Sequence, residues 1–309
     1  MTMPWLDPVR EEFRERLQGN RLAHAILLSG PGGTGKLGLA MDIAAALLCL
    51  ESSLPSCGKC RSCQLLVSGA HPDFRLLSFE ENEKGKLRSE IVIDQVRRLI
   101  STLQLTTTIS KRKVALIHPA ESMNKNAANA LLKTLEEPPG DAVIVLLSHD
   151  PSRLAITIRS RCQNLHVRLP DFSVAQAWLM ESGGYEQAEA GQALKAAAGS
   201  PIRASQLLPE GGMARYQLVS DTLESTFAGS CEPSGAIATL ADVEPEKLWT
   251  WFSLGAADKF RQNIDDRVLA LKLSQLQKEA DLNRTLLSSP VRKDLLLQDW
   301  LIQWSRLTD

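Results

Sequence analysis

Short apolar runs alternate with longer amphipathic stretches along the chain as far as Leu169. In Ile91–Leu105, for example, apolar residues recur every three or four positions and define one helical face. The predicted strands are Ala25–Leu28, Asp73–Leu77, Lys113–Ile117, Ala142–Ser148 and Leu165–Leu169, and the predicted helices include 8–20, Leu37–Leu50, Ile91–Leu105 and Lys125–Glu137. This alternation indicates a parallel sheet covered by helices on both faces.

The strand pattern fades after Leu169, and most of the remaining chain has a helical pattern. Breaks at Pro170–Ser173 and Pro209–Gly212 divide it further. We therefore predict three domains: an α/β domain over residues 1–168, a small helical domain over 169–208 and an all-helical domain over 209–309. Four tryptophans occupy apolar positions of the last domain and are expected in its core: Trp249, Trp251, Trp300 and Trp304.

The composition is that of an ordinary globular protein, with 309 residues, 44% hydrophobic and 23% charged, and a net charge of -1. This balance gives no global basic signal for nucleic-acid binding. The basic groups Arg97–Arg98 and Lys111–Lys113 are expected to lie on solvated helix or loop surfaces. No apolar run is long enough to span a membrane and no signal-peptide pattern is visible, so we expect a cytoplasmic protein. Cys162 and Cys231 are expected to be buried thiols.

The segment Gly30-Pro-Gly-Gly-Thr-Gly-Lys-Leu37 nearly matches the phosphate-binding loop G-x-x-x-x-G-K-[ST]. It follows a predicted strand and precedes a predicted helix, as this loop requires. Glycines let backbone amides approach phosphate oxygens closely, and the helix offers the positive end of its dipole. Gly30, Gly33, Gly35 and Lys36 are therefore candidate phosphate-binding residues. The alternative is a glycine-rich turn that binds no ligand.

Two parts of the magnesium site that accompanies such a loop are missing. Leu37 stands where a hydroxyl normally binds the metal. The strand Lys113–Ile117 should end in carboxylates, but His118 and Pro119 follow it, and Glu121 lies beyond the expected position. Because a bound metal offsets phosphate charge and organises the transfer, we expect neither a Mg²⁺ site nor ATP hydrolysis. ATP binding without hydrolysis stays open.

A cysteine cluster predicts a metal site. Cys57, Cys60 and Cys63 have the spacing C-x2-C-x2-C, and Cys49 precedes them. Four thiolates complete a tetrahedral zinc shell, and a closed shell of this kind is structural rather than catalytic. An iron–sulfur cluster would need a fourth cysteine soon after the third, followed by proline, and the sequence has neither. His71 is a competing candidate for the fourth zinc ligand.

Several longer motifs accompany these sites. They are the cysteine module followed by Ala70-His-Pro-Asp73, the segment Asn126-Ala-Ala-Asn-Ala-Leu-Leu-Lys-Thr-Leu-Glu-Glu-Pro-Pro139, the segment Thr157-Ile-Arg-Ser-Arg-Cys162, Gly199-Ser-Pro201 and Asn283-Arg284. Together they resemble the delta-prime family of subunits of the bacterial DNA polymerase III clamp loader, which are AAA+ proteins. The resemblance spans the whole chain. The two longest motifs also fit the ATP-hydrolysing gamma/tau subunits, so the missing magnesium ligands are what favour delta-prime.

The resemblance implies an AAA+ P-loop domain with a RecA-like parallel sheet and an inserted zinc module (49–63), a helical lid (169–208) and a helical collar (209–309) that oligomerises. It implies a hetero-oligomeric ring with gamma/tau and delta subunits, which loads the sliding clamp onto primed DNA at the replisome. The chain would be a non-hydrolysing stator of the DNA polymerase III holoenzyme, with no polymerase or exonuclease activity of its own. The alternative is an active AAA+ ATPase motor of the same or a related DNA-remodelling complex.

The resemblance also implies a role for Ser160 and Arg161. In the family, the arginine of this Ser-Arg-Cys motif reaches the ATP site of a neighbouring subunit as an arginine finger. A guanidinium at the γ-phosphate offsets the charge of the transferring group. A surface or salt-bridged arginine is the alternative, and Arg159 is a second candidate for the finger. Glu136 and Glu137 precede two prolines at a helix end and are expected to be structural rather than an acid/base pair.

Overall fold

The computed structural model describes residues 2–51, 54–82, 85–209, 211–287, 289 and 291–307. The chain divides into two compact units, Met1–Val174 and Ala175–Asp309. The separation of residues 169–208 from residues 209–309, as a lid and a collar, stays a prediction.

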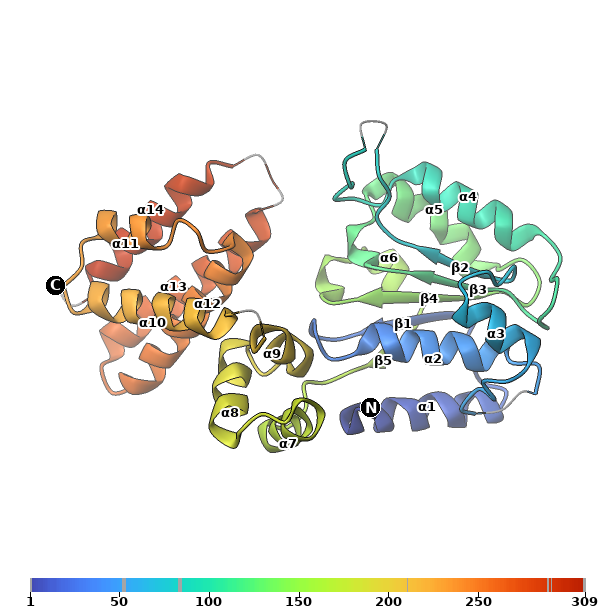
Figure 1. Cartoon of the computed structure of the whole chain (residues 1–309). Coiled ribbons are helices and arrows are strands. Elements are labelled where there is room, and N and C mark those ends of the chain that lie inside the picture. Colours follow the sequence, from blue (N-terminus) through green and yellow to red (C-terminus); the bar gives the residue numbers. More distant parts are fainter. Residues whose placement is uncertain are drawn as a thin grey trace. The chain divides into compact units, whose positions relative to one another are not determined.

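The first unit is a sheet between two layers of helices (Figure 1). Its strands are β1 (Ala25–Ser29), β2 (Phe74–Leu77), β3 (Val114–Ile117), β4 (Val143–Ser148) and β5 (Gln163–His166), and its helices are α1 (Asp7–Gln18), α2 (Lys36–Leu48), α3 (Arg61–Val67), α4 (Ile93–Gln104), α5 (Lys125–Glu136) and α6 (Ile156–Arg159), with short 3₁₀ turns η1 (Pro4–Leu6), η2 (Ala120–Ser122) and η3 (Pro151–Arg153). The described strands pair in parallel, in the order β2-β3-β4-β1-β5. The predicted α/β fold, a parallel sheet with helices on both faces, is confirmed.

The three central strands are buried on both faces. Every residue of β1, β3 and β4 is buried, which explains their continuous apolar runs. Successive side chains point to opposite faces, so Ile26 and Leu28 join the core under α1 and α2, whereas Leu27 joins the core under α4 and α5. Both helical layers therefore hold the carboxyl ends of the central strands, where the candidate residues lie.

The last strand was predicted at Leu165–Leu169, and this prediction is wrong by a few residues. The observed strand β5 begins at the polar pair Gln163 and Asn164 and ends at His166. Among the described strands, β5 pairs with β1 alone and so forms an edge of the sheet. An edge strand has one solvated side, which allows polar residues that an apolar pattern does not reveal.

Two further expectations need correction. Lys113 is not on a solvated surface: it is 5% exposed, and its ammonium lies 3.7 Å from the Asp73 carboxylate. Cys162 and Cys231 are half-buried rather than buried. By contrast, Arg97 and Arg98 are exposed as expected, where they form ion pairs with nearby carboxylates.

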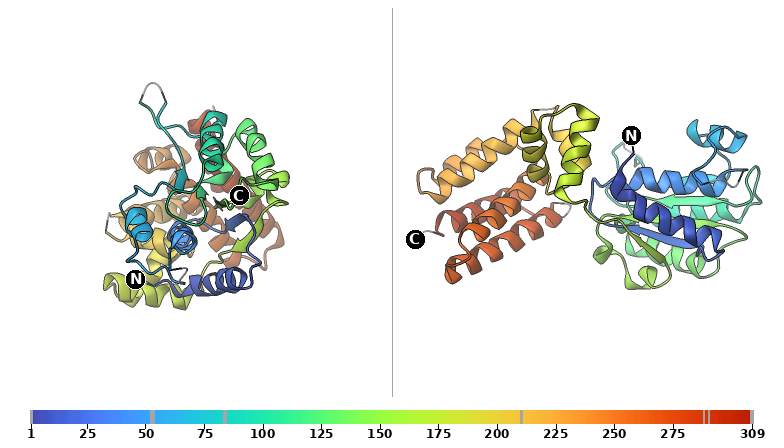
Figure 2. Two further views of the ribbon diagram at one scale, coloured as in Figure 1. Left: turned by 90° about the vertical axis from the view of Figure 1, so that its right-hand side faces the viewer. Right: turned by 90° about the horizontal axis from the view of Figure 1, so that it is seen from below.

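The second unit is helical throughout its described residues. Its helices are α7 (Phe172–Gly183), α8 (Gln187–Ala196), α9 (Pro201–Leu207), α10 (Gly212–Phe227), α11 (Pro233–Thr239), α12 (Pro245–Gln262), α13 (Arg267–Leu286) and α14 (Lys293–Ser305). Helices α12 and α13 lie side by side (Figure 1 and the right-hand view of Figure 2). The predicted all-helical C-terminal part is confirmed.

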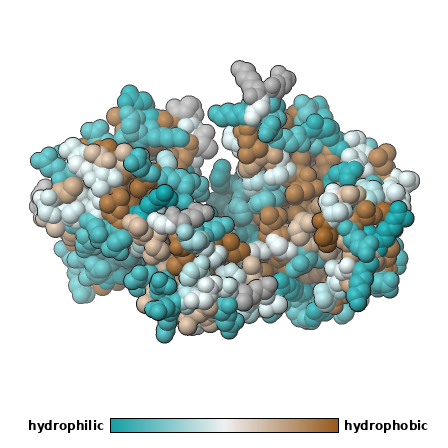
Figure 3. Space-filling view, in the orientation of Figure 1, coloured by the Kyte–Doolittle hydropathy of each residue, from teal (hydrophilic) through white to brown (hydrophobic). Residues whose placement is uncertain are grey.

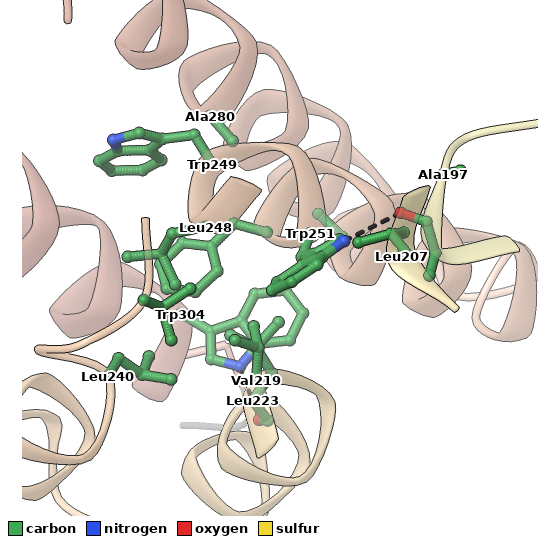
Figure 4. Packing of buried hydrophobic residues seen from close by; sticks show 14 of the residues in the cluster. Ala197, Leu207, Val219, Leu223, Leu240, Leu248, Trp249, Trp251, Ala280 and Trp304 are labelled. Carbon is green, nitrogen blue, oxygen red and sulfur yellow. Dashed lines mark hydrogen bonds between the residues drawn. The ribbon is translucent and has the colours of Figure 1, made fainter. Parts of the chain in front are cut away.

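The tryptophans of the second unit form its core, as predicted. Trp249, Trp251, Trp300 and Trp304 are each 1–3% exposed, and Figure 4 shows three of them among the surrounding leucines. Trp300 stacks on Phe252 and on Trp304, with ring centroids 4.4 and 5.2 Å apart. The indole N–H groups of Trp251, Trp300 and Trp304 donate to the carbonyls of Ala196, Leu276 and Leu223, each at 2.9 Å. The rings therefore act as packing groups and not as surfaces for stacking bases.

No helix among the described residues is long and apolar enough to cross a membrane. On the face drawn in Figure 3, hydrophilic and hydrophobic residues lie side by side over both units.

Candidate functional site

The glycine-rich loop joins β1 to α2, as its sequence predicts. Gly30 has φ 139°, and a Cβ there would lie 2.0 Å from the Val167 carbonyl oxygen. Gly35 caps α2 with φ 87°, and a Cβ there would lie 2.3 Å from the sulfur of Met3. Gly33 also has a positive φ, of 72°. The loop therefore has the backbone that a phosphate loop needs, and its two ends pack closely against other segments.

Lys36 lies inside this loop. The residue is 2% exposed, and its ammonium donates a short hydrogen bond to the Pro31 carbonyl and a longer one, at 3.4 Å, to the Thr34 hydroxyl. The Trp5 indole donates to the Thr34 carbonyl at 2.8 Å, which fixes the loop from the N-terminal side. Leu37, the next residue, is 43% exposed and has no atom that could bind a cation. The lysine thus holds the loop together in this structure.

The position after β3 carries a neutral histidine. Burial lowers the pKa of His118, and the Lys36 ammonium lowers it further, although the Glu121 carboxylate opposes this shift. One oxygen of Glu121 accepts the backbone N–H of His149 at 2.9 Å. Among the described residues, His118 Nδ1, the other Glu121 oxygen and the Ser148 hydroxyl find no hydrogen-bond partner. The His118 imidazole provides none of the negative charge that a magnesium site requires, and the carboxylate beside it is that of Glu121.

The four cysteines of the predicted module come together. Cys49 directly follows α2, Cys57 and Cys60 lie in the loop after it, and Cys63 lies in α3. The four sulfurs are all within 4.8 Å of one another. The Cys57 and Cys63 sulfurs are 4.0 Å apart, close to the ~3.8 Å that tetrahedral Zn–S bonds of about 2.3 Å require. Backbone N–H groups of Cys57 and Cys60 point at the Cys49 and Cys57 sulfurs. This donor set suits a soft, four-coordinate metal ion.

His71 is not part of that shell, because both of its ring nitrogens are engaged elsewhere. Ser62 and Ser110 each donate their one hydroxyl proton to the Leu48 carbonyl, at 2.7 and 2.8 Å. Neither can then donate to His71 Nε2, which lies 2.8 and 3.3 Å away, so Nε2 carries the proton and donates. Nδ1 accepts the backbone N–H of Asp73 at 3.0 Å. Burial lowers the pKa of His71 despite the nearby Asp73 carboxylate, consistent with a neutral ring. His71 therefore ties the cysteine module to the sheet.

The candidate finger lies at the surface of the first unit. Arg161 follows α6, and its guanidinium contacts the Glu136 carboxylate through Nε at 2.6 Å and through Nη2. Nη1 donates to the Thr157 carbonyl at 2.9 Å and lies 3.4 Å from the Ser160 hydroxyl. Arg159 is also exposed. The sequence did not predict the Arg161–Glu136 pair, because 25 positions separate the two residues and no periodic pattern relates them.

Known proteins resemble this chain in sequence and in structure. The family model described as "DNA polymerase III, delta subunit" matches residues 6–171. The chain is 38% identical to DNA polymerase III subunit delta' of Pseudomonas aeruginosa, over 98% of this chain and 97% of that protein. It is 37% identical to subunit delta' of Escherichia coli over 64% of this chain and 58% of that protein, and 34% identical to subunit tau/gamma of Haemophilus influenzae over 50% and 22%.

Among solved structures, a gamma subunit-related protein of DNA polymerase III from Thermotoga maritima has a TM-score of 0.48 and 18% identity, covering 98% of this chain and 99% of that one. The family model spans more than half of the chain, and the Pseudomonas relative covers nearly all of it. The chain belongs to the delta-prime family of DNA polymerase III subunits.

Proposed function

We propose that this chain is a non-hydrolysing subunit of the DNA polymerase III clamp loader, and that Arg161 serves the ATP site of a neighbouring subunit. The names of its relatives, delta' and tau/gamma, support membership of that complex. In this proposal the chain joins gamma/tau and delta subunits in a ring that loads the sliding clamp onto primed DNA, in the bacterial cytoplasm. Residues 169–208 act as the lid and residues 209–309 as the collar through which the subunits assemble.

One observation supports the proposal: two positions that bind Mg²⁺ in the ATPase pattern carry Leu37 and His118, whereas Arg161 is exposed. Leu37 offers no oxygen, and His118 beside Lys36 is neutral. Lys36 is already hydrogen-bonded within its loop, so a phosphate would have to displace those bonds. Arg161, by contrast, has a side chain 34% exposed, at the surface. The competing function, an active ATPase motor, would require another group to bind the metal.

We propose further that the cysteine cluster binds one structural Zn²⁺ through Cys49, Cys57, Cys60 and Cys63. The spacing of the sulfurs supports this assignment. A zinc ion supplies a covalent-strength cross-link between the end of α2 and the start of α3, and a shell of four thiolates leaves no open position for catalysis. ATP and Mg²⁺ have no role at this module.

The first experiment measures steady-state ATP hydrolysis by the purified chain with Mg²⁺ and primed DNA. We expect no turnover above background and no change on Lys36→Ala, because the metal position lacks its ligands. Turnover that Lys36→Ala abolishes would contradict the proposal and assign the chain to the motor class.

The second experiment tests Arg161 in the complex reconstituted with the gamma/tau and delta subunits of the same organism. Arg161→Ala should assemble normally but lose turnover at the one site that it serves, since an arginine finger contributes roughly 10³- to 10⁵-fold at its site. Arg153→Ala is the matched control, because it removes an exposed arginine outside the Ser-Arg-Cys motif, and Arg159→Ala tests the second candidate for the finger. Unchanged turnover in a fully assembled Arg161→Ala complex would refute the finger role.

A further inference from the structure

We infer that Glu136 is a positioning residue for the Arg161 finger, an inference that rests on the finger role proposed above. Glu136 lies in the Glu-Glu-Pro-Pro segment at the end of α5, which the sequence suggested was structural only. In the folded chain its carboxylate is the acid that faces the guanidinium. Glu136 acts on the neighbouring ATP only through Arg161.

All three nitrogens of the Arg161 guanidinium make contacts within the chain. Nε and Nη2 face one carboxylate oxygen of Glu136, so this whole edge of the guanidinium is occupied. Nη1 donates to the Thr157 carbonyl and approaches the Ser160 hydroxyl. An arginine side chain has five N–H donors. These contacts leave the outer N–H of Nη2 for an incoming phosphate oxygen, and they set the direction in which it points.

Glu136 ends α5 and Arg161 lies in the turn after α6, and the core holds both helices in place. Glu136 is the last residue of α5 and follows Leu135, which is 0% exposed. Arg161 lies three residues after Ile158, which is also 0% exposed. Leu135 and Ile158 belong to one apolar core on the same face of the sheet. The core therefore fixes the backbone from which the Glu136 and Arg161 side chains extend.

The position of the Arg161 guanidinium should affect the rate of ATP hydrolysis. A free arginine side chain populates many rotamers, and their loss on binding opposes catalysis by a finger that must reach a single phosphate. A carboxylate that already restricts the guanidinium reduces this cost before the neighbouring subunit binds ATP. The pair is exposed, with side chains 34% and 48% accessible, so removal of the carboxylate should leave the fold intact.

The test is ATP hydrolysis by the reconstituted complex carrying Glu136→Ala, with Glu137→Ala as the matched control. Glu137 is an exposed acid one residue further along, outside the helix. For each complex, finger-dependent turnover is its rate of ATP hydrolysis minus the rate of the Arg161→Ala complex. We expect Glu136→Ala to lower the kcat of this finger-dependent turnover by about fivefold to tenfold and to leave the KM for ATP unchanged, because positioning acts on the transition state. Glu136→Gln, which keeps an acceptor oxygen, should recover part of the loss.

The double variant Glu136→Ala/Arg161→Ala separates positioning from other roles. It should hydrolyse ATP at the rate of Arg161→Ala alone, because Glu136 has no effect without the arginine. Normal finger-dependent turnover in Glu136→Ala would overturn the inference, as would an additional loss in the double variant. If Arg161→Ala itself has no effect, the proposed finger role fails first, and this outcome is distinct from a failure of Glu136 alone.

Discussion

Asp73 allows a prediction about stability whose size follows from geometry. Its carboxylate is 2% exposed and accepts the backbone N–H groups of Thr108, Ile109 and Ser110, at 2.8, 2.8 and 2.9 Å. Its charge partner is the buried ammonium of Lys113, at 3.7 Å. Burial alone would raise the pKa of Asp73, but the three N–H donors and Lys113 outweigh it and hold the pKa below its usual value. The carboxylate thus joins the segment before β3 to the start of β2.

Asp73→Asn removes the charge and leaves the geometry almost unchanged. Lys113 then remains buried without its counter-ion, and an amide NH₂ faces backbone donors. Breaking a buried ion pair by removing one partner costs about 3–5 kcal/mol of unfolding free energy. At about 1.4 kcal/mol per tenfold change, this cost corresponds to a roughly 10²- to 10⁴-fold increase in the population of the open state.

Amide hydrogen exchange of the full chain, followed in peptides that contain β3, measures this cost. Most of the tryptophans lie in the second unit, so their fluorescence would report on the wrong core. Glu80→Gln is the control, since it breaks an exposed pair with Arg98 and should cost less than about 1 kcal/mol. A further change of Lys113→Met should recover part of the stability lost in Asp73→Asn. Exchange in Asp73→Asn within about threefold of the wild-type rate would refute the assignment of a buried pair.

The same pair predicts a pH dependence. The pKa of Asp73 is lower in the folded chain than in the unfolded chain. The stability that ionised Asp73 contributes is therefore fully present above its pKa in the unfolded chain. It is lost as the pH falls through its pKa in the folded chain. In Asp73→Asn this part of the acid sensitivity should be absent, so the two proteins should converge in stability as the pH is lowered.

Two further predictions concern the metal module and the second core. Native mass spectrometry should find one zinc per chain; Cys60→Ser should lose it and speed hydrogen exchange in α3, whereas Cys231→Ser, outside the cluster, should retain it. Zinc retained in full by Cys60→Ser would contradict the four-cysteine shell. Trp300→Ala should lower the unfolding free energy of the second unit by about 3–5 kcal/mol, because it removes a ring 1% exposed that stacks on Phe252. Leu295→Ala on the same helix is the control, since Leu295 is 51% exposed and should cost little in a denaturant titration.

The features that the sequence predicted well are those that repeat along the chain. The central strands read as apolar runs because helices cover both of their faces, and the helices between them read as periodic because each has one buried side. The tryptophans of the second unit were placed in the core because they fall on such periodic positions. The cysteine spacing was informative because thiolates have few other reasons to cluster.

The features that the sequence did not predict are pairs of polar groups far apart along the chain. Lys113 follows two other basic residues and so looked like part of a solvated run, yet its partner Asp73 makes it a core residue. The strand β5 was misplaced because Ser29 on β1 donates to the side chain of Asn164, which makes a polar residue acceptable there. In both cases tertiary contacts decide the environment, and no local pattern contains that information.

The glycine-rich loop shows that residues of a phosphate-loop motif can also serve the packing of the domain. Gly30 cannot carry a side chain because the backbone of Val167 lies against it, and Gly35 needs a positive φ to begin α2. Lys36 hydrogen-bonds within the loop, so its ammonium has a structural use without any phosphate. Gly30, Gly35 and Lys36, which predict nucleotide binding, thus also serve the packing or hydrogen bonding of this domain. Leu37 and His118 are the positions at which the sequence departs from the ATPase pattern. The loop therefore gives evidence for the fold, whereas the evidence about activity comes from the metal position.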